Sequence, residues 1–121
     1  MTNLTANFLY LHNLIDTSYV LRKLKDDYGV LAIKAEFEAE GFRLDELIML
    51  NEVVFRADMD LIIKIGGCEA VRDLDQCKLL GTHGIMASMI ETPFAMEKYI
   101  NQSQASRNNE RVIFMTKNIF V

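Results

Sequence analysis

Along the chain, the pattern of hydrophobic and polar residues repeats every two residues in some segments and every three or four residues in others. Val30–Glu38 and Leu61–Ile65 are short and rich in β-branched residues, so each run predicts a strand. The second run is apolar at nearly every position, as in a strand buried on both faces. Apolar residues spaced three or four apart predict helices over residues 8–27, 43–57, 68–80 and 94–100, and further strands are expected at 84–90 and 111–121.

Turn and cap residues separate these blocks. Gly66 and Gly67 end the second strand, Gly81 occupies a helix C-cap position, and Thr92 followed by Pro93 opens the last helix. Strands that alternate with single helices predict right-handed crossovers and a parallel sheet, which is an α/β fold. We therefore expect one domain over residues 1–121, with a leading helix in 1–29 and three to four β/α units in 30–121. Residues 101–110 are polar and are expected to form a loop.

Composition restricts the classes of function. Half of the 121 residues are hydrophobic and 25% are charged, and the net charge is −4 with no basic run. This balance predicts a soluble protein with no nucleic-acid partner. No apolar stretch approaches the roughly 20 residues that span a bilayer, and no signal peptide pattern is present, so a cytoplasmic location is expected. Cys68 and Cys77 are nine residues apart in one predicted helix, which is too far for a disulfide.

Strand alternation places Lys34, Glu36 and Glu38 on one face of the first strand. Two interpretations account for three charges in this position. The face could simply be exposed to solvent at the edge of the sheet. Alternatively, it could form the polar mouth of a barrel, where side chains near the carboxyl ends of strands contact a ligand.

Lys64 is the charged residue inside the most apolar strand, and a buried lysine is rare unless it is paired or functional. It could neutralise Glu36 or Glu38 on the neighbouring strand as a structural ion pair. It could instead bind the carboxylate or phosphate of a substrate. A lysine can also form a Schiff base with a carbonyl compound, and this role is the least favoured of the three.

Two further features offer weaker candidates. Gly66 and Gly67 before a helix N-terminus could bind phosphate through backbone N–H groups, although Glu69 would repel an anion there. Glu91 is expected at the carboxyl end of its strand, where barrel enzymes place catalytic groups. An acidic residue beside Thr92 also stabilises the start of a helix through its dipole, and this is the structural alternative.

Three segments together resemble the aldolase/citrate lyase family of HpcH/HpaI-type barrels: IKAEFEAEGFRLDEL (33–47), LIIKIGGCEAVRDL (61–74) and LGTHGIMASMIETPFAMEKYI (80–100). The resemblance covers about three quarters of the chain in order. It implies a (β/α)₈ barrel, a divalent metal (Mg²⁺ or Mn²⁺), and carbon–carbon bond cleavage or formation through the enolate of a pyruvate- or acyl-type substrate. A metal would act there as a Lewis acid on the enolate oxygen.

The same resemblance assigns roles to the candidate residues. Lys64 and Glu91 fall at catalytic positions at the strand ends, and the substrate, a small anionic carboxylate, would meet the remaining candidates: Glu36, Glu38, Gly66 and Gly67. The family's metal ligands come from later strands, so no metal ligand is assigned in this chain.

A closed barrel of this type has eight strands and roughly 250 residues. The chain supplies about four strands, so we expect a half barrel of parallel strands with outer helices, inactive unless another segment completes it. That segment could be the remainder of a longer barrel or a second copy in a homo-oligomer. Two alternatives remain open: a non-catalytic half barrel that self-associates through its sheet edges, and a phosphate-binding barrel enzyme that uses Gly66 and Gly67.

Overall fold

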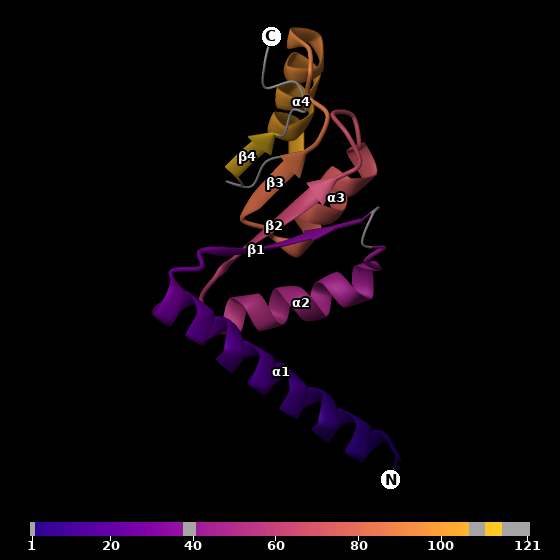
Figure 1. The fold of residues 1–121 in the computed structure, drawn as a ribbon. Coiled ribbons are helices and arrows are strands. Elements are labelled where there is room, and N and C mark those ends of the chain that lie inside the picture. Colours follow the sequence, from indigo (N-terminus) through magenta and orange to yellow (C-terminus); the bar gives the residue numbers. More distant parts are fainter. Residues whose placement is uncertain (1, 38–40, 107–110, 115–121) are drawn as a thin grey trace.

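The chain alternates helices and strands from end to end (Figure 1). The computed structural model describes residues 2–37, 41–106 and 111–114. Its elements, in chain order, are α1 (Thr2–Tyr28), β1 (Ala32–Glu36), α2 (Leu44–Arg56), β2 (Asp60–Ile65), α3 (Val71–Leu80), β3 (Gly84–Ala87), α4 (Pro93–Ser106) and β4 (Arg111–Phe114). None of the helices in these ranges has both the length and the apolar character needed to cross a membrane.

The strands form one parallel sheet in the order β1-β2-β3-β4, so each strand pairs with its neighbour in the sequence. The register places Glu36 of β1 opposite Lys64 of β2, and Lys64 opposite Met86 of β3. The α/β class and the parallel sheet predicted from the sequence are therefore confirmed.

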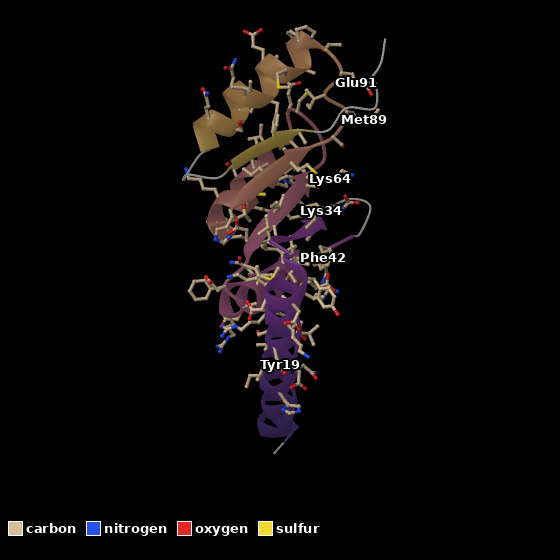
Figure 2. The ribbon with its side chains drawn as sticks, turned by 60° about the vertical axis from the view of Figure 1, so that its left-hand side comes forward. Tyr19, Lys34, Phe42, Lys64, Met89 and Glu91 are labelled. Carbon is tan, nitrogen blue, oxygen red and sulfur yellow. The ribbon has the colours of Figure 1, made fainter. Side chains whose placement is uncertain are left out.

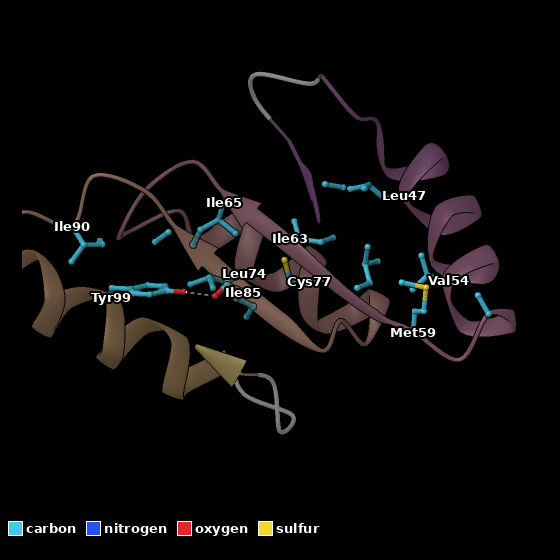
Figure 3. Packing of buried hydrophobic residues seen from close by; sticks show 14 residues of the cluster. Leu47, Val54, Met59, Ile63, Ile65, Leu74, Cys77, Ile85, Ile90 and Tyr99 are labelled. Atoms are coloured by element: carbon cyan, nitrogen blue, oxygen red, sulfur yellow. Dashed lines mark hydrogen bonds between the residues drawn. The ribbon is translucent and has the colours of Figure 1, made fainter. Parts of the chain in front are cut away.

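One face of the sheet carries the hydrophobic core (Figure 3). Leu61, Ile63 and Ile65 alternate along β2 and are buried, because this face is covered by helices. The buried side chains of the three helices that follow β1 join the same cluster, with Leu47 and Val54 from α2, Leu74 and Cys77 from α3, and Tyr99 from α4. The Tyr99 hydroxyl donates a hydrogen bond of 2.8 Å to the carbonyl oxygen of Ile85, which ties α4 to β3.

The opposite face of the sheet, which we call the open face, carries Lys34, Glu36, Ile62, Lys64 and Met86. No described helix packs its buried side chains on this face. Sequential strands whose crossover helices all cover one face are typical of a sheet that curves into a barrel, whereas doubly wound sheets have helices on both faces. The described part of the chain is an open parallel sheet of this singly wound kind.

Helix α1 is longer than predicted and presents a different face. It runs from Thr2 to Tyr28 and lies against α2, with the Ser18 hydroxyl donating to the carbonyl oxygen of Val53 (3.3 Å). Leu14 is buried, whereas Ile15 and Tyr19, which belong to the same apolar pattern of the sequence, are exposed. Figure 2 shows Tyr19 on this helix. The apolar pattern alone did not reveal which side of this helix meets α2.

In α2 too, the apolar pattern does not by itself show which side of the helix is buried. Leu47 and Val54 of its apolar stripe are buried, but Ile48 and Phe55 of the same stripe are exposed. The apolar stripe of this helix is wider than the strip that contacts the sheet, so part of it faces solvent.

Several other segment boundaries also differ from the sequence prediction. Val30 lies in the turn that caps the end of α1, because its N–H group donates to the carbonyl oxygen of Leu24, and β1 therefore starts at Ala32. Strand β3 ends at Ala87 rather than Ile90, because Met89 has a φ of 63° and extended pairing cannot continue through it. Helix α4 continues to Ser106, through the first part of the predicted polar loop.

The predicted caps are confirmed. The N–H group of Ala95 donates to the Thr92 hydroxyl (3.1 Å) at the start of α4. Gly81 has a φ of 66° at the end of α3, a conformation that glycine adopts without strain. Cys68 and Cys77 are free cysteines, and Cys68 lies before the start of α3 and not in the helix that the sequence predicted for both.

Candidate functional site

A cluster of three charged side chains lies on the open face, at the carboxyl ends of β1 and β2 (Figure 2). Glu36 Oε2 is 2.9 Å from Lys64 Nζ and 3.2 Å from Lys34 Nζ. We call Lys34, Glu36 and Lys64 the lysine–glutamate cluster. Two cations therefore share one carboxylate oxygen.

The cluster follows from strand geometry. Lys34 and Glu36 are two residues apart on β1, so they share a face, and the register places Lys64 directly opposite Glu36. The predicted ion pair between Lys64 and Glu36 is confirmed. Glu38, the other predicted partner, lies outside the described residues.

The Glu36 carboxylate is enclosed, whereas the lysines reach solvent. The exposed fraction of its side chain is 7%, against 26% for Lys64 and 43% for Lys34. Hydrogen bonding to Lys64 lowers the pKa of Glu36 below its usual value, and Lys34 acts in the same direction, while burial opposes both. Glu36 is thus ionised at neutral pH, and the three groups together carry one net positive charge.

This arrangement is suited to binding a small anion. Ammonium groups form short, charge-assisted hydrogen bonds to carboxylates. The partly exposed lysines can each direct a donor toward a ligand, while Glu36 fixes where their nitrogens lie. The geometry accounts for a structural ion pair and is also compatible with anion binding by Lys64.

Gly66 and Gly67 are arranged differently from the prediction. The Gly66 N–H group donates to Asp73 Oδ2 at 2.8 Å, so a carboxylate of α3 already occupies it. Helix α3 begins at Val71, not at Cys68, so the glycines are separated from the helix N-terminus by a turn. A phosphate bound at Gly66 would have to displace Asp73.

Glu91 is not at the end of a strand. It is exposed on the loop between β3 and α4, beyond the turn at Met89 (Figure 2). Because this loop follows the carboxyl end of β3, it belongs to the same edge of the sheet as the lysine–glutamate cluster. Glu91 therefore lies at that edge, but its position is set by a loop and not by strand pairing.

The described residues do not fit a divalent metal. Among them, no three or more His, Cys, Asp or Glu side chains gather as ligands. Glu36, the carboxylate enclosed on the open face among the described residues, already bonds two ammonium groups, and these would repel a cation. His83 lies at the opposite edge, where its Nδ1 accepts a hydrogen bond from the Leu61 N–H group (3.1 Å).

Two residues that contact the candidate site residues were not singled out from the sequence. Strand alternation placed Lys34 on the charged face, and that signal could have identified it as a second cation beside Glu36. Asp73 was recognisable only as an acidic residue near the start of a helix, and its bond to Gly66 depends on a loop path that no local pattern encodes.

Comparisons with protein-family models, curated proteins and solved structures find no match to this chain. Membership of the aldolase/citrate lyase family therefore stays a proposal.

Proposed function

We propose that this chain is the substrate-binding half of a carbon–carbon lyase of the aldolase/citrate lyase type, acting on a small carboxylate. The observation that carries the proposal is the lysine–glutamate cluster at the carboxyl ends of β1 and β2. Enzymes built on parallel β/α units bind their substrates at this edge. The family resemblance, whose quoted segments include the three cluster residues, favours the same reaction class.

The cluster suggests how this half would contribute. Lys64 and Lys34 would bind the substrate carboxylate and stabilise negative charge on an enolate oxygen, because fixed donors in a partly enclosed site favour developing charge. Glu36 would hold both ammonium groups in place. Glu91, on the loop after β3, would be the candidate proton acceptor. No step is assigned to a metal, since the described residues do not fit one.

The singly wound sheet supports a barrel as the complete structure. Its order β1-β2-β3-β4 is that of successive barrel strands, and eight such strands close a (β/α)₈ barrel. The open face would then line the interior, with the lysine–glutamate cluster near the mouth.

Oxalate tests the proposed carboxylate site, because it is a planar dianion similar in size and charge to the enolate of pyruvate. In a titration followed by amide NMR with EDTA present, we expect saturable shifts around Glu36 and Lys64. Lys64→Met should weaken binding about 10- to 100-fold, the effect of losing a hydrogen bond between charged groups.

Lys78→Met is the matched control, since Lys78 lies exposed on α3 away from the open face. It should bind oxalate as the parent protein does. Equal affinities for the parent and the folded Lys64→Met variant, or shifts that never saturate, would contradict the proposal.

A second candidate function is self-association without catalysis. It is favoured by the edge strands β1 and β4, each of which pairs on one side only within the described sheet, and by the uncovered open face.

Light scattering over a range of concentrations should then give a defined dimer. Met86→Lys, which places a charge on the open face, should shift this dimer to monomer. A monomer at every concentration would exclude this candidate.

A further inference from the structure

We propose that Met86 and Met89 select the substrate by forming an apolar wall beside Lys64, against which the aliphatic part of a carboxylate packs. This inference deepens the proposed function and rests on its carboxylate site. It names the substrate class as a carboxylate that continues into a chain of a few carbon atoms and ends without a second charge.

The open face changes character from one strand to the next. It carries Lys34 and Glu36 on β1, Ile62 and Lys64 on β2, and Met86 on β3. Charged side chains therefore lie toward β1 and apolar side chains toward β3. A ligand that binds across this face meets charge at one end and an apolar surface at the other.

Met86 is the apolar neighbour of Lys64. The register pairs the two residues on adjacent strands, and side chains at paired positions on one face lie about 5 Å apart, within contact range. Both residues are partly exposed, whereas Ile85 and Ala87, which point to the core, are buried. A molecule whose carboxylate binds Lys64 Nζ can therefore place its next carbon atoms against Met86.

Met89 adds an exposed apolar side chain at the same edge of the sheet. It lies on the loop after β3, and Figure 2 shows Met89 and Lys64 toward the same end of the sheet. Its φ of 63° is a left-handed conformation, which costs free energy in a residue that has a Cβ atom. Because 51% of Met89 is exposed, packing does little to offset this cost. Strain of this kind is typical of functional sites.

The other positive φ of a non-glycine residue among the described ranges has a structural explanation. Asp58 (φ 55°) follows the end of α2, and its N–H group donates to the carbonyl oxygen of Phe55. Its carboxylate lies 2.9 Å from Lys25 Nζ, so its side chain also holds α1 against α2. The thioether of Met89 is only a weak acceptor and offers no comparable bond. Folding thus accounts for Asp58, and ligand contact is the role we assign to Met89.

The chemistry of this wall favours an aliphatic chain as its occupant. Lys64 supplies the cation for one carboxylate, and the paired position on β3 is Met86 in place of a second basic residue. A second carboxylate lying over Met86 would lose hydration without gaining a partner. Methionine side chains are flexible and adapt to apolar groups of different shapes, which suits a class of chains better than one compound.

Methyl NMR on the full chain, labelled with carbon-13 at the methionine methyl groups, tests the inference. Pentanoate should bind about tenfold more tightly than acetate, because its additional CH₂ groups are partly removed from water. Succinate, which ends in a second carboxylate, should bind no more tightly than acetate. The methyl signals of Met86 and Met89 should shift with pentanoate and much less with acetate. Equal affinities for pentanoate and acetate, or for pentanoate and succinate, would overturn the inference.

Met89→Gly separates ligand contact from folding. Glycine relieves the strain at this φ, so the variant should melt at or above the temperature of the parent protein. It should bind acetate as the parent does and lose most of the preference for pentanoate. Asp58→Gly, the same kind of change at the other positive φ, is the matched control and should keep the preference. A Met89→Gly variant that keeps the full preference would remove Met89 from the wall.

The apolar groove between α1 and α2 is the competing place for an aliphatic chain. Its lining includes Leu14, Met49, Leu50 and Val53. The methyl group of Met49 therefore reports on the groove in the same spectra. Pentanoate that shifts Met49 and leaves Met86 unchanged would show adventitious binding in the groove and would overturn the inference.

The oxalate titration separates the two proposals. Oxalate binding without a preference for pentanoate would refute the apolar wall and retain the carboxylate site. A preference for pentanoate with shifts of Met86 and Met89, in a chain that does not bind oxalate, would retain the wall and refute the enolate site. Absence of both would refute both.

Discussion

Replacing Ile63 by alanine is expected to lower the free energy of unfolding by about 2–5 kcal/mol, the usual cost of truncating a fully buried aliphatic side chain. Ile63 is completely buried at the centre of β2, where it joins the cluster formed with the helices. Its neighbours on both adjacent strands restrict how far the sheet can collapse into the cavity. Urea unfolding followed by circular dichroism measures the change.

Ile48→Ala is the matched control, because it removes the same atoms from an exposed position on α2. It should change stability by no more than about 0.5 kcal/mol. Equal losses for the two variants would contradict the assignment of the core to one face of the sheet. The dependence on urea should have the same slope in all three proteins, since the area exposed on unfolding barely changes.

Glu36→Gln is expected to remove part of the pH dependence of stability. The folded-state pKa of Glu36 is lowered, first by its hydrogen bond to Lys64, so the folded protein binds this proton less readily than the unfolded chain. The carboxylate therefore contributes full stability above its ordinary pKa, and this contribution is lost as the pH falls through the lowered value. The variant should be less stable at neutral pH, and the difference should narrow in acid.

Thermal unfolding of both proteins across the acid range checks this result. The pKa values of Asp45 and Asp58 are also lowered by their basic partners, but both groups titrate in both proteins and cancel in the difference. Glu52→Gln, which changes an exposed carboxylate on α2, is the control. A difference between Glu36→Gln and the parent that stays constant with pH would show that Glu36 contributes through packing and not through charge.

The element types could be read from the sequence because they depend on local periodicity. The apolar run of β2 and the cap residues Thr92 and Gly81 carry their signals within a few positions. The inward side of α1 could not be read in this way. Leu14 and Ile15 are equally apolar, and only contact with α2 buries one and exposes the other.

The site was predictable where it depends on strands. The Glu36–Lys64 pair requires only alternation and the adjacency of sequential strands, and both are visible in the sequence. Loop positions were not predictable. The turn at Met89 separates Glu91 from its strand, and the bond from Gly66 to Asp73 joins a loop to a helix, so neither follows from periodicity.

The pairing of each strand with its sequence neighbour also has a kinetic consequence. Every described sheet contact joins strands separated by one helix, so no contact in the sheet spans more than one β/α unit. Closing each of these loops therefore costs less entropy than a pairing between the two ends of the chain would. The arrangement therefore allows β1 and β2 to assemble around α2 while the ribosome is still synthesising the later units, each of which adds to an existing edge.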